Sequence, residues 1–273
     1  MERDRMKKPF RSFALLASVL SATVLMTGCA TPEMPSDITL DELELKMAQA
    51  MDPAGKYRNA YAYFQRQNIE EEGLFTTNYQ LVEVKFQRPD KFKLSYYSKN
   101  KIATEVLSVG GQAWLIDYKS GTITAVEGQA LEKFKLMLEL GHPDTDYDKL
   151  FAQVDITQVE LDDRWCYKLV CHPKLPDANA ITIYIDKITA LPRRMDLSVK
   201  TVNGTIESVC NIVEYRKFGS VTLPVLTNVI ENSREYSTRV VDYQLNAVFN
   251  SNEFTLPSFD PVLMESRRLR QKR

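Results

Sequence analysis

Histidine is scarce in this chain, which contains only two histidines among 273 residues. His142 lies in a Gly-His-Pro-Asp turn and His172 ends a strand-like segment before a proline, and we interpret both as ordinary structural residues. The sequence also lacks Gly-x-Ser-x-Gly, His-Glu-x-x-His and the Gly-x-x-x-x-Gly-Lys-Ser/Thr phosphate-binding motif. We therefore expect a protein that is not an enzyme.

Cysteine is almost as rare, with four residues in the whole chain. Cys166 and Cys171 are five residues apart in a strand-like segment, so their side chains should point to opposite faces and not pair with each other. A disulfide from either one to Cys210, or three free thiols, remains open. The cysteines lack metal-site spacing, and the alternating aspartates of residues 144–148 lack the glycine and distal glutamate of a calcium loop. We expect no cofactor.

Between its two basic ends, the chain has no excess of basic residues. Residues 1–11 carry a net charge of +3 and residues 267–273 carry +5, whereas the whole chain carries −1. The residues between these ends are therefore acidic, and an acidic body is a poor match for nucleic acid. We expect no nucleic-acid partner, and we interpret residues 260–273 as a basic, disordered tail.

A hydrophobic run long enough to cross a membrane is also missing. The apolar segment of residues 12–26 is shorter than the ~20 residues that a spanning helix needs. It follows a basic segment, which is typical of a secretory signal peptide. Translation could start at Met1 or at Met6, because the latter gives a cleaner signal sequence.

The signal-like segment ends in Met26-Thr27-Gly28-Cys29, which resembles the lipobox of bacterial lipoproteins, with Met in place of the usual Leu. The resemblance implies a signal peptide over residues 1–28, cleavage before Cys29, and acylation of that cysteine. Several acyl chains anchor a protein durably, whereas one does not. Residues 29–36 would then form a lipidated linker. Residue 30 is Ala and not the Asp that resembles an inner-membrane retention signal in such lipoproteins. We therefore expect an envelope protein on the outer membrane, facing the periplasm, and not on the inner membrane.

The remainder of the chain alternates between apolar and polar residues, which predicts β-strands. Short turns separate the segments, as in an antiparallel meander, and Asn203-Gly204 is a strong hairpin signal. The predicted strands are 61–67, 78–86, 91–98, 102–109, 112–118, 122–126, and the segments DITQVEL, WCYKLVC, AITIYID, PRRMDLSVK, GTIESVCNIVEY, PVLTNVIEN and YSTRVVDYQL.

Helical spacing appears in three places. Residues 39–51 begin with a Thr39-x-x-Glu42 capping box, residues 128–141 end at a glycine, and residues 144–154 indicate a shorter helix. We therefore predict a mainly β, α+β fold. Its core would be a strongly curved antiparallel sheet or incomplete β-barrel of about 11 strands, with helices covering the concave apolar side.

A covered concave face is either a cavity or a filled core, and both have the same sequence signature. If it is a cavity, apolar residues of the predicted strands and of the 128–141 helix should line it. The candidates are Val82, Val84, Phe86, Phe92, Leu94, Tyr96, Trp114, Leu131, Phe134 and Leu138.

The segments FQRPDKFKLSYYS (86–98), VGGQAWLIDYKSGTIT (109–124), ITALPRRMDLSVKTVNG and FTLPSF resemble, in this order, the LolA-like family of lipoprotein-localisation factors. The resemblance implies a lipid-binding domain over residues 37–259, an incomplete barrel with a helical lid, and a hydrophobic cavity for acyl chains. It also implies that Arg88, in the Arg-Pro motif, helps to hold the lid shut. Arg66 is a weaker candidate for this role.

The chain differs from both kinds of protein in that family: unlike the soluble carriers it has its own lipobox, and unlike the lipidated LolB-like receptors it has the Arg-Pro motif. We expect a lipid-anchored, monomeric binding protein that accepts acyl chains of lipoproteins, or of another lipid, during transport to the outer membrane. An envelope sensor or interaction protein with the same fold, which detects lipid or a protein partner, is the alternative.

Overall fold

The structure is a computed structural model, and it describes residues 32–56, 62–72, 77–140, 142, 145–175, 178–201 and 204–259. Residues Pro32–Arg273 form one compact unit. The predicted signal peptide, the lipobox with Cys29 and the basic tail of residues 260–273 lie outside the described residues.

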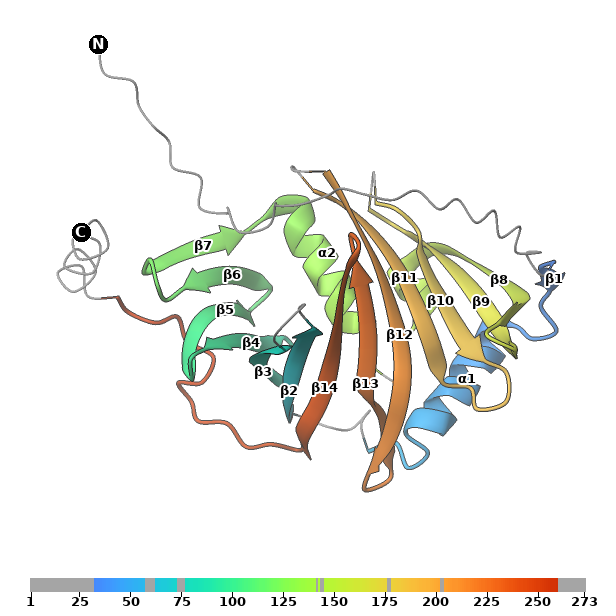
Figure 1. The fold of residues 1–273 in the computed structure, drawn as a ribbon, viewed down its shortest axis with the longest axis horizontal. Helices are drawn as coiled ribbons and strands as arrows, with labels where there is room; N and C mark the ends of the chain where they lie inside the picture. The colour runs from blue at the N-terminus through green and yellow to red at the C-terminus, as the bar shows by residue number, and fades with distance from the viewer. Residues whose placement is uncertain are drawn as a thin grey trace, which may run out of the picture. The chain divides into compact units, whose positions relative to one another are not determined.

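Fourteen strands form one sheet that is antiparallel throughout and is not closed (Figure 1). The strands are β1 (Met34–Pro35), β2 (Ala62–Glu72), β3 (Thr77–Gln87), β4 (Lys91–Ser98), β5 (Lys101–Val109), β6 (Gln112–Asp117), β7 (Thr122–Val126), β8 (Phe151–Leu161), β9 (Arg164–Pro173), β10 (Ile181–Asp186), β11 (Pro192–Thr201), β12 (Gly204–Phe218), β13 (Val221–Glu231) and β14 (Arg234–Leu245).

The sheet has two consecutive runs of strands that meet in its middle. Its order is β1-β8-β9-β10-β11-β12-β13-β14-β2-β3-β4-β5-β6-β7, so β14 pairs with β2 and joins the C-terminal run to the N-terminal run. Figure 1 shows β4–β7 crossing the direction of β11–β14 at a steep angle, as expected for a large twisted sheet. The predicted fold class is confirmed.

All thirteen predicted strands are present, and β1 is the additional one. Its two residues are too short to show any alternation, and they become a strand only because Met34 and Pro35 pair with Gln158 and Thr157 of β8. The sheet therefore has 14 strands, where the sequence predicted 11 to 13.

Helix α1 (Leu40–Met51) begins with the predicted capping box. The Thr39 hydroxyl accepts a hydrogen bond from the Glu42 amide at 3.3 Å, and the Glu42 carboxylate accepts one from the Thr39 amide at 3.0 Å. Its apolar stripe then buries Leu43 and Met47 against β9 and β10. The stripe at helical spacing thus fixes α1 on one face of the sheet.

Helix α2 (Gly128–Glu139) lies against both runs of strands. Phe134 makes an edge-to-face contact with Phe92 of β4, with ring centroids 5.6 Å apart. Leu136 packs on the apolar cluster of β8–β11 that also contains Leu169 and Ile183. We call this helix-covered side of the sheet the inner face.

The third predicted helix, over residues 144–154, is wrong in its extent. Helix α3 covers only Tyr147–Leu150, and β8 begins at Phe151. Asp146 caps α3 by accepting a hydrogen bond from the Lys149 amide at 2.9 Å. Phe151 is almost fully buried in the inner-face cluster and pairs with Pro173 of β9, so tertiary packing ends the helix after one turn.

Candidate functional site

Six of the candidate lining residues share the inner face. They form three directly opposed pairs between β3 and β4: Val82 with Tyr96, Val84 with Leu94, and Phe86 with Phe92. Opposed residues of an antiparallel pair point to the same face. Because Phe92 contacts α2, this apolar strip faces the helices. Val82, Phe86 and Phe92 are buried, and the other three are half-buried.

Helix α2 supplies the facing surface. Phe134 and Leu131 are half-buried, while the side chain of Leu138 lies outside what the structure describes. Leu136 lines a small, mostly apolar pocket of about 40 Å³ together with residues of β9, β10, β11 and the connection between β9 and β10. A cavity of this size is far smaller than the ~300–1,000 Å³ of typical ligand pockets, so α2 is seated closely on this part of the sheet.

Trp114 does not share this face. Phe92 is paired with Ser108, and Ser108 with Ala113, whereas Trp114 is paired with Leu107. Trp114 therefore points to the opposite side, which we call the outer face, and it packs there against the cluster of Leu107 and Ile116. The prediction grouped it with inner-face residues because the turn between β5 and β6 shifts the alternation.

Arg88 directly follows β3 and lies near the C-terminal end of α2. With Phe86, Pro89, Glu139 and His142 it lines a cleft of about 300 Å³. The cleft joins the apolar strip of β3 to the link between α2 and α3, where the Phe86 and His142 rings are 4.9 Å apart.

Arg66, the weaker candidate, lies on the outer face. Its guanidinium forms an ion pair with Glu83 at 2.7 Å, and Glu83 also accepts a hydrogen bond from Tyr97 at 2.8 Å. Residue 83 alternates with Val82 and Val84 and therefore points away from the helices. Of the two arginines, Arg88 is thus the one placed beside α2.

Helices α1 and α3 are joined through Glu44, a residue that no sequence motif marks. Its carboxylate accepts a hydrogen bond from the Tyr147 amide at 2.9 Å, and both residues line a pocket of about 50 Å³ with His142 and Thr145. Burial raises the pKa of the Glu44 carboxyl, and the nearby charge of Asp146 adds to the increase. In the sequence Glu44 is one of several acidic residues of an amphipathic helix, so nothing marks it.

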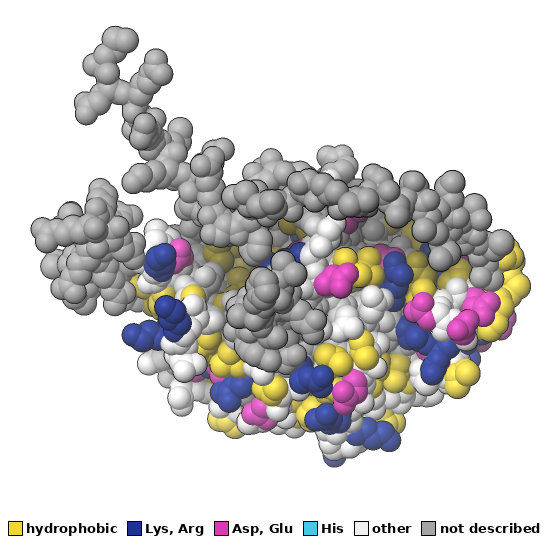
Figure 2. Space-filling view, in the orientation of Figure 1, with side chains coloured by type: hydrophobic (Ala, Val, Ile, Leu, Met, Phe, Trp, Pro, Cys, Tyr) yellow, Lys and Arg dark blue, Asp and Glu magenta, His cyan; other side chains and the backbone are white. Residues whose placement is uncertain are grey.

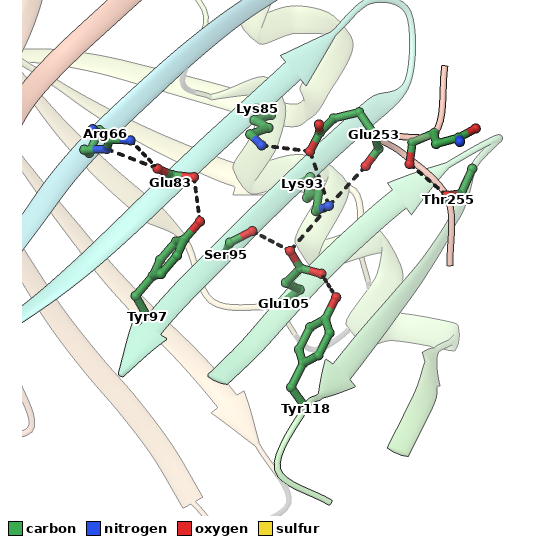
Figure 3. Close-up of polar contacts among 11 residues, drawn as sticks. Arg66, Glu83, Lys85, Lys93, Ser95, Tyr97, Glu105, Tyr118, Glu253 and Thr255 are labelled. Carbon is green, nitrogen blue, oxygen red and sulfur yellow. Dashed lines mark hydrogen bonds and ion pairs between the residues drawn. The ribbon is translucent and has the colours of Figure 1, made fainter. Parts of the chain in front are cut away.

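The outer face of β2–β6 carries a charged cluster beneath the segment that follows β14 (Figure 3). Lys85 and Lys93 are directly opposed on β3 and β4, which is unfavourable for like charges. The Glu253 carboxylate lies against both ammonium groups, at 2.8 Å and 3.3 Å. Lys93 also lies 3.4 Å from Glu105, a buried carboxylate that accepts hydrogen bonds from the hydroxyls of Ser95 and Tyr118.

Glu253 belongs to residues 246–259, which we call the C-terminal strap. Burial raises the pKa of its carboxyl, but the hydrogen bond and charge of Lys85, with the charge of Lys93, outweigh burial and hold the pKa below its ordinary value. Phe254 of the strap is buried against Leu107 and Ile116. The terminal Phe-x-Leu-Pro segment therefore closes the outer face and not the inner one.

The three body cysteines are free thiols. Cys171 lies in the inner-face cluster, and burial raises its pKa to about 12. Cys166 is also buried, while Cys210 is half-buried. His172 is exposed and contacts Asp155 at 3.1 Å. Within the described ranges, no group of three or more histidine, cysteine or acidic side chains is arranged to hold a metal ion.

Among the helices that the structure describes, none combines the length and the apolar character required to cross a bilayer.

No protein-family model and no curated protein matches the sequence. Solved structures match over most of the chain. A DUF1329 family protein from Desulfovibrio piger has a TM-score of 0.55 at 12% identity, with 78% of this chain and 94% of that chain covered. A LolA superfamily protein from Nitrosomonas europaea has a TM-score of 0.56 at 10% identity, with 80% and 98% covered.

A third similar structure is a domain from Vibrio parahaemolyticus assigned to outer-membrane lipoprotein sorting. It has a TM-score of 0.51 at 10% identity, with 77% of this chain and 94% of that chain covered. At such identities the similarity establishes the fold, and that fold is LolA-like.

Proposed function

We propose that this protein is a lipid-anchored binding protein of the bacterial envelope. It accepts acyl chains of lipoproteins, or of another lipid, between α2 and the inner face, and it acts in their transport to the outer membrane. Cys29 is its point of acylation, and no cofactor or catalytic residue takes part. The observation that carries the proposal is the apolar strip of β3–β4 beneath a helix that contacts both runs of strands.

The free energy gained by burying an acyl chain exceeds the cost of lifting α2 from the sheet. Lifting α2 uncovers Leu131, Phe134 and Leu136, at roughly 1.5–3 kcal/mol for each fully buried side chain and less for these half-buried ones. Burying a C16 acyl chain contributes roughly 10 kcal/mol gross at ~0.8 kcal/mol per CH₂. An acyl chain can therefore displace α2 and keep a surplus against the entropy of binding.

Arg88 is proposed to hold the closed state. It sits where the strip of β3 reaches the end of α2, and the neighbouring Glu139 is the last residue of that helix. A guanidinium can donate several hydrogen bonds to carbonyl groups at a helix C-terminus, where the helix dipole also favours a cation. Acyl-chain entry would separate this end of α2 from β3.

The test is a cross-linking experiment on protein that starts at residue 30, because Pro32–Arg273 is one compact unit. In a Cys210→Ser background, Phe92→Cys and Phe134→Cys are joined with a short bismaleimide to fix α2 on β4. Uptake of a fluorescent fatty acid should fall at least tenfold. The control joins Phe249→Cys to Phe254→Cys, a pair of contacting rings in the strap, and should leave uptake unchanged.

Mass spectrometry of the protein purified without cross-linking should show bound lipid. A protein that is empty, and that takes up neither fatty acid nor lipoprotein with α2 free, would contradict the binding function. The close seating of α2 on the sheet would then favour the alternative, a sensor or interaction protein, which predicts a stable protein partner and no transfer of lipid.

A further inference from the structure

Two adjacent turns at one end of the sheet expose large apolar side chains. Ile188, in the turn between β10 and β11, is 90% exposed, and Trp165, at the start of β9, is 41% exposed. The Lys187 amide donates a hydrogen bond to the Trp165 carbonyl at 3.0 Å, so the turn between β10 and β11 is bonded directly to the start of β9. We call Trp165 and Ile188 with their turns the apolar tip.

The apolar tip is held in place by a buried carboxylate. Asp186 is 2% exposed and accepts hydrogen bonds from the amides of Ile188 and Thr189, at 2.9 Å and 2.8 Å. Its other oxygen contacts Arg164 at 3.3 Å and lies 3.7 Å from Arg193. Ile188 is thus presented to solvent by a fixed turn, and a fixed, exposed isoleucine has no use in the packing of this chain.

The beginning of the described chain is attached at this same end. Because β1 is antiparallel to β8, with Met34 opposite Gln158, its N-terminal direction leads toward the turn between β8 and β9. Lys187 of the apolar tip forms an ion pair with Asp37 at 2.9 Å. Cys29 precedes Pro32 by three residues, which span at most ~10 Å in an extended chain.

We infer that the apolar tip contacts the membrane that holds the lipid anchor, and that Ile188 and Trp165 enter the interface of a zwitterionic bilayer. Tryptophan is favoured at the level of the head groups, and an aliphatic side chain gains by leaving water. The inference rests on the proposed anchor at Cys29, which would keep this end of the sheet beside the bilayer.

The charges around the apolar tip indicate apolar and not electrostatic docking. Arg164 and Arg193 lie against Asp186, and Lys187 is paired with Asp37. The turn between β8 and β9 additionally exposes Asp162 and Asp163. In the view of Figure 2, basic and acidic side chains are interspersed and do not gather in one basic patch. Binding should therefore not require anionic lipid.

Tryptophan quenching tests the contact in the mature, acylated protein. The protein is reconstituted into phosphatidylcholine/phosphatidylethanolamine vesicles that contain brominated phosphatidylcholine. With Trp114→Phe, which leaves Trp165, emission should fall at least twofold. With Trp165→Phe, which leaves Trp114 on the outer face, emission should stay within a tenth. Equal quenching of the two variants, or none of Trp165, would overturn the inference.

Protein that starts at residue 30 provides a second measurement, which does not need acylation. Its partition onto the same vesicles should fall roughly tenfold with Ile188→Asn, as expected for losing one buried aliphatic side chain. Val213→Asn is the matched control, because Val213 is 56% exposed in the middle of β12, and it should change partition less than twofold. Equal effects of the two substitutions, or binding that appears only with anionic lipid, would contradict apolar docking.

The membrane contact of the apolar tip and the proposed lipid-binding function can fail independently of each other. Quenching of Trp165 in a protein that takes up no acyl chain would refute the lipid-binding function alone. Acyl-chain uptake by a protein whose Trp165 is not quenched would refute the membrane-facing tip alone.

Discussion

The ion pairs of Glu253 allow a quantitative prediction about the C-terminal strap. In Glu253→Gln the carboxylate between Lys85 and Lys93 is replaced by a neutral amide, while the side-chain volume is kept. The side chains of Glu253, Lys85 and Lys93 are only 21%, 21% and 16% exposed. The two directly opposed ammonium groups therefore lose the carboxylate that lies against both of them in a partly desolvated place, although Lys93 keeps its contact with Glu105 at 3.4 Å.

The expected loss lies between two known limits. Exposed ion pairs contribute 0–1 kcal/mol, whereas breaking a buried pair costs about 3–5 kcal/mol. With about a fifth of each side chain exposed, we expect the free energy of unfolding to fall by about 2 kcal/mol at pH 7. Urea denaturation measures it. The control is Glu132→Gln, which removes an exposed ion pair with Lys135 on α2 and should cost less than about 0.5 kcal/mol.

The pH dependence gives the same prediction a second readout. The pKa of the Glu253 carboxyl is lowered in the folded state, so its stabilisation is present above its ordinary pKa of 4.5 and is lost as the pH falls through the lower, folded value. The difference between wild type and Glu253→Gln should therefore shrink as the pH is lowered below 4.5. A difference below 0.5 kcal/mol at pH 7, or one that is undiminished at low pH, would refute the role given to Glu253.

Three further predictions concern the helices and the thiols. The pKa of the Glu44 carboxyl is raised in the folded state, so ionised Glu44 lowers stability at neutral pH. This penalty disappears as the pH falls through the folded pKa toward 4.5. Glu44→Gln should therefore raise the melting temperature slightly at pH 7 but not near pH 3. Arg88→Ala should speed fatty-acid uptake several-fold in stopped-flow fluorescence, whereas Arg66→Ala should not, and equal rates would exclude a latch at Arg88. Cys210 should react with a thiol reagent in the native protein while Cys171 stays protected until unfolding, and equal reactivity would show that the inner face is open.

The alternation of apolar and polar residues was sufficient to predict the thirteen longer strands. Successive side chains of a strand point to opposite faces of the sheet, so a strand with one covered face has this alternation in its own sequence. The capping box of α1 was predictable for a similar reason, since both of its hydrogen bonds are local. Strand β1 and the short length of α3 were not predictable, because distant residues of β8 and β9 determine both.

The candidate site was predictable in part. The apolar strip of β3 and β4 could be predicted because both strands show the same alternation, and the short turn between them places their apolar residues opposite each other in three pairs. Trp114 was assigned to the wrong face because the alternation shifts at the turn between β5 and β6, and the aromatic residue itself does not indicate the shift. Glu44, Asp186 and Glu253 were missed since their partners lie far away in the sequence or in the backbone of a turn.

The most direct test of the binding function is to locate a bound acyl chain. The protein is incubated with a photoactivatable palmitate analogue, irradiated and digested, and the labelled peptides are identified by mass spectrometry. Labels on residues 82–96 and on α2, with none on the strap or on Trp114, are the predicted result. Labels confined to the outer face, or labelling that excess palmitate does not compete away, would contradict binding between α2 and the inner face.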